Sequence, residues 1–133
     1  MKEIILFILI LIIAPTLFST NILNQKKEAT ISIEDITTDK AIYHSSEFLN
    51  LNVKIRSNSD LEDVIVKVEG IRGRFKGEEI LGVKEGITDV PFSYKLPRCN
   101  VCGGIKAGDY TLDCEILYKD IVLRNSITIN IQQ

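Results

Sequence analysis

The stretch FLNLNVKIRS, residues 48–57, alternates apolar and polar side chains almost without exception. Its apolar members, which fall on one side of an extended chain, are Leu49, Leu51, Val53 and Ile55. Successive side chains of a β-strand point to opposite faces, so the stretch predicts a strand with one buried face. Such a strand must bury its apolar face against a second layer of structure.

The same period of two recurs along the chain on both sides of this stretch. The other predicted strands lie in residues 29–36, 63–71, 72–86, 90–96, 109–118 and 126–131. About seven strands separated by turn clusters predict an all-β domain of two antiparallel sheets packed face to face. Within residues 90–96, Pro91 predicts an edge strand, because proline donates no ladder hydrogen bond. The core residues that the alternation predicts include Leu51, Val53, Val66, Phe92 and Cys114.

The N-terminus has a different pattern, because residues 4–18, IILFILILIIAPTLF, form an apolar run without a charge. This run follows the short start MKE and precedes a polar stretch, the layout of a signal peptide or a signal anchor. We therefore expect an N-terminal hydrophobic helix in residues 1–20, a polar spacer in residues 21–29 and the β-domain in residues 30–133. The predicted location is extracellular, or membrane-anchored through residues 4–18 and facing outward.

The charge balance argues against one class of partner. The chain has 133 residues with 16 Lys and Arg, 18 Asp and Glu, and a formal net charge of −2. It shows no basic patch of the kind that nucleic acid requires. We therefore expect no nucleic-acid partner.

Two segments resemble a known family. Residues 37–60 carry Lys40, Tyr43 and Glu47 in an order similar to the K-x-x-Y-x-x-G-E turn of the CARDB type, immunoglobulin-like domains of prokaryotic surface proteins. Ser46 stands where that pattern usually has glycine. Residues 105–118, IKAGDYTLDCEILY, resemble the penultimate strand of those domains. The resemblance implies an immunoglobulin-like sandwich over roughly residues 30–132 that binds or spaces, without a catalytic site.

Independently of any family, Tyr110 is predicted to be structural. It starts a strand just after the turn residues Gly108 and Asp109, and its alternation places the ring in the core. A tyrosine at the end of a sandwich core directs its hydroxyl to a loop backbone, as in the tyrosine corner.

The segment RCNVCGGIKAGDYTLDC, residues 98–114, holds all three cysteines of the chain. We predict that Cys99 and Cys102 form a local disulfide that stiffens a loop, and that Cys114 is a reduced core residue. One alternative is a thiol redox pair, although the glycines that follow Cys102 make the required helix start unfavourable. A second is a metal site that uses Cys99 and Cys102, which needs more ligands than this pair supplies.

No catalytic constellation or cofactor motif is found. His44, the single histidine, lies in a predicted turn, so nucleophilic catalysis has no evident base. Residues 70–79, GIRGRFKGEE, lack the order of a phosphate-binding loop and read as a turn-rich edge region. We therefore expect a non-catalytic binding or structural module without a cofactor, whose partner the sequence does not specify. Another hypothesis is a subunit of a surface assembly, joined by edge-strand pairing along residues 72–82.

Overall fold

The structure is a computed structural model that describes residues 27–98 and 104–133. The predicted N-terminal helix lies outside these residues, as do most of the predicted spacer, Cys99 and Cys102. The described part contains eight strands. They are β1 (Ile31–Thr38), β2 (Ile42–His44), β3 (Phe48–Ser57), β4 (Leu61–Gly70), β5 (Phe75–Val83), β6 (Gly86–Lys95), β7 (Gly108–Tyr118) and β8 (Ile121–Gln132). None of the described segments forms a helix that is long and apolar enough to cross a membrane.

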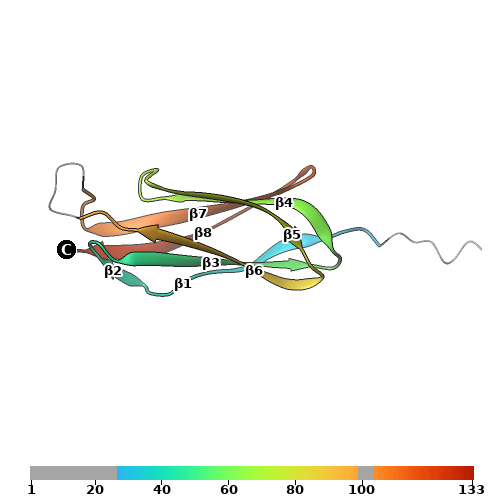
Figure 1. Ribbon diagram of the computed structural model, residues 1–133, viewed down its shortest axis with the longest axis horizontal. Coiled ribbons are helices and arrows are strands. Elements are labelled where there is room, and N and C mark those ends of the chain that lie inside the picture. The colour runs from blue at the N-terminus through green and yellow to red at the C-terminus, as the bar shows by residue number, and fades with distance from the viewer. Residues whose placement is uncertain (1–26, 99–103) are drawn as a thin grey trace, which may run out of the picture.

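The strands form the two packed sheets that the sequence predicts (Figure 1). One sheet has the order β1-β3-β6 and the other has the order β2-β8-β7-β4-β5. The pairings are antiparallel, as predicted, with one exception: β2 runs parallel to β8. β6, which carries Pro91, forms one edge of the three-stranded sheet.

The prediction of about seven strands is corrected to eight because the chain crosses between the sheets early. β1 pairs with β3 in one sheet, and β2 then pairs with β8 in the other. Asp39 lies at the crossing, where its carboxylate accepts hydrogen bonds from the Tyr43 hydroxyl and from the backbone and side-chain nitrogens of Asn50. The Asn130 amide of β8 donates to the carbonyl of Ala41 at 3.0 Å. The segment between β1 and β2 is thus held to both sheets.

The protonation states of Tyr43 and Asp39 at this crossing follow from their burial and their hydrogen bonds. Tyr43 is fully buried, and its hydroxyl also accepts a bond from the Lys40 amide at 3.1 Å. Burial, together with the bond to Asp39, raises the pKa of Tyr43 to about 12. Partial desolvation of the exposed Asp39 carboxylate opposes its ionisation, but the bonds from Tyr43 and Asn50 lower its pKa below the usual 3.8. The folded chain therefore stabilises a neutral tyrosine beside a charged aspartate.

The core lies between the sheets and is built from the inward side of each alternating strand. Along β3, the buried apolar residues are Leu49, Leu51, Val53 and Ile55, as the alternation predicts. The residues singled out from the sequence are at most 8% exposed, and they are Leu51, Val53, Val66, Phe92, Tyr110 and Cys114. The apolar area removed from water by this alternation is the main stabilising contribution to the sandwich.

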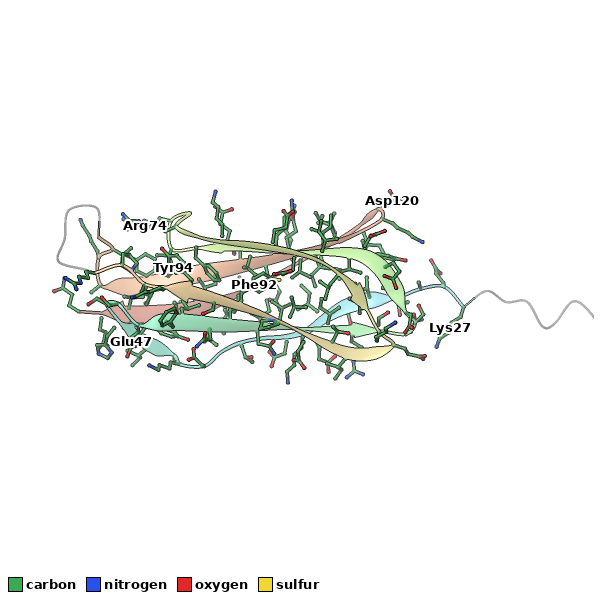
Figure 2. The ribbon with its side chains drawn as sticks, viewed as in Figure 1. Lys27, Glu47, Arg74, Phe92, Tyr94 and Asp120 are labelled. Carbon is green, nitrogen blue, oxygen red and sulfur yellow. The ribbon has the colours of Figure 1, made fainter. Side chains whose placement is uncertain are left out.

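The sandwich has two ends with different loops (Figure 1). We call the end that holds residues 27–30, 58–60, 84–85 and 119–120 the near end. We call the opposite end, which holds residues 45–47, 71–74, 96–98, 104–107 and the C-terminus, the far end. Figure 2 shows Lys27 and Asp120 toward the near end, and Arg74 and Glu47 toward the far end.

Candidate functional site: a basic pole at the far end

The structure places the site residues that the sequence singled out in different surroundings. Cys114 is a free, buried thiol in β7, and burial raises its pKa to about 11. His44 ends β2 and is exposed, with Nδ1 at 4.0 Å from a carboxylate oxygen of Glu47. Residues 27–98 and 104–133 contain no group of three or more His, Cys, Asp or Glu arranged to hold a metal. The disulfide, redox and metal hypotheses for Cys99 and Cys102 lie outside these residues and stay predictions.

Both flanks of the segment between β6 and β7 are tied to the sandwich. On the first flank, the amide of Leu96 donates to the carbonyl of Glu47 at 2.9 Å, and Leu96 itself is buried. On the second flank, Ile105 is buried and the Tyr110 hydroxyl donates to the carbonyl of Lys106 at 2.6 Å. The side chains of Arg98 and Lys106 are thereby held at the far end, where both are exposed.

The turn between β4 and β5 presents two arginines at the same end. Arg72 and Gly73 have φ angles of 55° and 78°, and the Arg74 amide donates to the Ile71 carbonyl at 3.2 Å, which are features of a type I′ turn. Ile71 also has a positive φ of 53°, which costs a β-branched residue about 1–2 kcal/mol. Its side chain is only 1% exposed, and such burial contributes about 1.5–3 kcal/mol. The buried isoleucine therefore holds the strained turn in place, with both arginines exposed.

Aromatic side chains connect these segments. Phe75, next to Arg74, stacks on Tyr94, next to Lys95, with ring centroids 5.3 Å apart. The Arg72 guanidinium lies 5.9 Å from the centre of the Tyr110 ring, within the range of a cation–π contact. We call the group assembled in this way the basic pole, and it consists of Arg72, Arg74, Lys95, Arg98 and Lys106.

The residues of the basic pole share one property, which is the lack of an acidic partner within the described part of the chain. Among the described residues, seven ion pairs join a Lys or Arg to a carboxylate, and none includes a basic-pole residue. The carboxylates of the far end have other partners: Glu47 pairs with Lys40, Glu69 pairs with Lys76, and Asp109 accepts a hydrogen bond from the side-chain nitrogen of Asn130. No carboxylate of the described residues therefore forms an ion pair with the five positive charges of the pole.

The outer face of the five-stranded sheet shows the opposite arrangement. A shallow hollow there is lined by charged side chains of β4, β5, β7 and β8. Its basic side chains are paired: Lys67 with Glu78, Lys76 with Glu69, and Arg124 with Glu115. These charges largely cancel one another, so the hollow attracts a charged ligand less than the pole does.

The basic pole is not predicted from the sequence. Residues 70–79 are interpreted there as a turn-rich edge region. Arg72 and Lys106 are 34 positions apart, and no motif links them. A signal was present in Phe75 and Tyr94, the aromatic residues next to Arg74 and Lys95, but their contact depends on the strand pairing.

Comparison with known proteins places the fold. No family model and no curated protein sequence matches this chain. Among solved structures, the CARDB domain of a Pyrococcus furiosus protein is similar in its solution structure, with a TM-score of 0.58 and 9% identity over 77% of this chain and 94% of that one. Its crystal structure, in complex with di-metal ions, gives a TM-score of 0.57 and 10% identity over 79% of this chain and 88% of that one.

A third similar structure is an alkylpurine DNA glycosylase of Pseudomonas fluorescens bound to DNA with an abasic-site analogue. The TM-score is 0.56 at 11% identity over 77% of this chain. The chain spans 30% of the length of that glycosylase, so the likeness concerns one part of it. At these identities the likenesses concern fold alone, and at that level the resemblance to CARDB domains is confirmed: this chain folds as a CARDB-like, immunoglobulin-like sandwich.

Proposed function

We propose that this chain is a non-catalytic binding module, held at or released from the outer face of a membrane, that contacts its partner through the far end. The observation that carries the proposal is the separation of the two ends. The described chain begins at the near end, and the basic pole lies at the far end (Figure 2). An anchor in residues 4–18 would therefore leave the pole directed away from the membrane.

The fold supports a binding role. CARDB-like sandwiches are modules whose sheets form a rigid scaffold, and loops on such scaffolds carry recognition. The turn at residues 71–74 and the flanks at 96–98 and 104–107 are each fixed by buried residues or hydrogen bonds. A surface fixed before binding loses little conformational entropy when a partner arrives.

The location is tested by labelling intact cells of the native host with a membrane-impermeant amine reagent. The exposed lysines of the domain, such as Lys95 and Lys106, are the expected sites of modification. We expect labelling in intact cells equal to that in lysed cells, while a cytoplasmic marker protein reacts only after lysis. Intact-mass measurement of the same sample shows whether residues 1 to about 20 are removed. An unlabelled, full-length chain in the cytosolic fraction would refute the proposed location.

A further inference from the structure

We infer that the basic pole binds a short acidic segment of a protein partner. This inference rests on the proposed binding function and adds the chemical class of the partner. Three of the five pole residues are arginines: Arg72, Arg74 and Arg98. A guanidinium presents its donors as a planar fork that matches a carboxylate with two parallel hydrogen bonds. None of the three forms an ion pair within the described chain, so their guanidinium groups can bind carboxylates of a partner.

The pole also has an apolar neighbour, which favours a polypeptide over other anions. Phe48 is 56% exposed, and the Lys95 ammonium lies 5.7 Å from the centre of its ring. The two residues face each other across β3 and β6. An exposed aromatic side chain is typical of protein interfaces, where aromatic residues and arginine supply most of the binding energy. An inorganic polyanion such as polyphosphate would leave this ring without a contact.

The extent of the pole sets the size of the partner segment. Beyond it, the hollow on the outer face of the five-stranded sheet is lined by three basic side chains and by a larger number of carboxylates, which are Glu69, Glu78, Asp113 and Glu115. The whole chain has a net charge of −2. A long polyanion that continued past the pole would meet these like charges, whereas a short acidic segment ends before them.

The test uses the full chain in a non-ionic detergent and a fluorescent peptide of about twelve residues, made of Glu and Gly with one central Phe. Binding is followed by fluorescence anisotropy at about 50 mM salt, where surface charges are only weakly screened. We expect saturable binding that weakens as salt rises. A peptide with Gln in place of Glu should not bind, and one with Ala in place of Phe should bind several-fold more weakly.

Three double variants test whether the peptide binds at the basic pole. R72Q/R74Q removes the charges of the turn, and K95Q/R98Q removes charges next to β6 without altering the turn. Each is expected to weaken binding roughly tenfold, as two lost charge pairs of up to about 1 kcal/mol each imply. The matched control K27Q/K84Q removes two positive charges from the near end and should change affinity less than twofold. Circular dichroism spectra and melting curves verify that each variant is folded.

Several results would overturn the inference. One is no binding of the Glu peptide at up to about 1 mM, the limit of a weak specific interaction. Others are equal loss in the control and pole variants, or polyphosphate binding tighter than the peptide at the same pole. These outcomes are separate from the test of location. If the chain is exposed at the cell surface but does not bind acidic peptides, only this inference is refuted. If the chain is cytosolic but binds them, only the proposed location is refuted.

Discussion

Replacing Tyr43 by phenylalanine tests what holds the crossing between β1 and β2. The substitution keeps the buried ring and removes a hydroxyl that donates to Asp39 and accepts from the Lys40 amide. A hydrogen bond to a charged group contributes about 1.5–3 kcal/mol. Because Asp39 is exposed, water replaces part of the lost bond, and we expect a loss of about 1–2 kcal/mol in the free energy of unfolding at pH 7. For a domain of this size, that lowers Tm by about 5–10 °C.

The loss should also depend on pH. The pKa of Asp39 is lowered in the folded chain, so its charged form contributes stability above the unfolded value near 3.9. That contribution disappears as pH falls through the lower, folded pKa. The difference between wild type and Tyr43→Phe should therefore shrink as pH falls from 7 to below about 4.

The measurement is urea unfolding followed by circular dichroism across this pH range. Tyr94→Phe is the matched control, because the Tyr94 hydroxyl makes no hydrogen bond among the described residues and its ring would still stack on Phe75. We expect the control to change stability by less than about 0.5 kcal/mol. If Tyr43→Phe were as stable as wild type at pH 7, or if its deficit did not change with pH, the assignment of the crossing to this hydrogen bond would be refuted.

Three further predictions concern the core and its titration. Gly77→Ala should lower the free energy of unfolding in urea by about 1–3 kcal/mol, because a Cβ there would lie 2.6 Å from the Phe92 ring. In the same strand, the Cβ of Gly82→Ala would lie 3.0 Å from the flexible carboxylate of Glu62, so this variant should lose less stability. Equal losses would contradict this packing. Cys114, buried with a raised pKa, should resist iodoacetamide at pH 8 and react on unfolding in guanidinium, as peptide mapping would show; rapid native labelling would contradict its burial. In an alkaline titration followed by tyrosinate absorbance, Tyr43 should ionise near pH 12. The free energy of unfolding should fall as pH rises from about 10, the pKa of an unfolded tyrosine. Ionisation of Tyr43 near pH 10 in the folded chain would contradict this prediction.

The alternating pattern was sufficient to predict the main strands and the two-sheet architecture. In β3, the four inward residues are the ones that the sequence places on one side, because the side-chain period of a strand is set by local geometry. The position of β6 at a sheet edge agrees with Pro91, whose missing amide hydrogen is a property of that residue alone. For Cys99 and Cys102, the sequence offers a disulfide hypothesis that the described residues do not test.

The crossing from β1 to β2 and the basic pole were decided by tertiary structure alone. Asp39 holds the crossing through Asn50, eleven positions away, and β2 pairs with β8 at the other end of the chain. Arg72 and Lys106 come together because Tyr110 contacts the first and hydrogen-bonds the backbone of the second. Local alternation determines which face of a strand is buried, but which strands become neighbours depends on how the two sheets bury those faces together. A surface assembled from separate loops therefore has no signature in any one segment of the sequence.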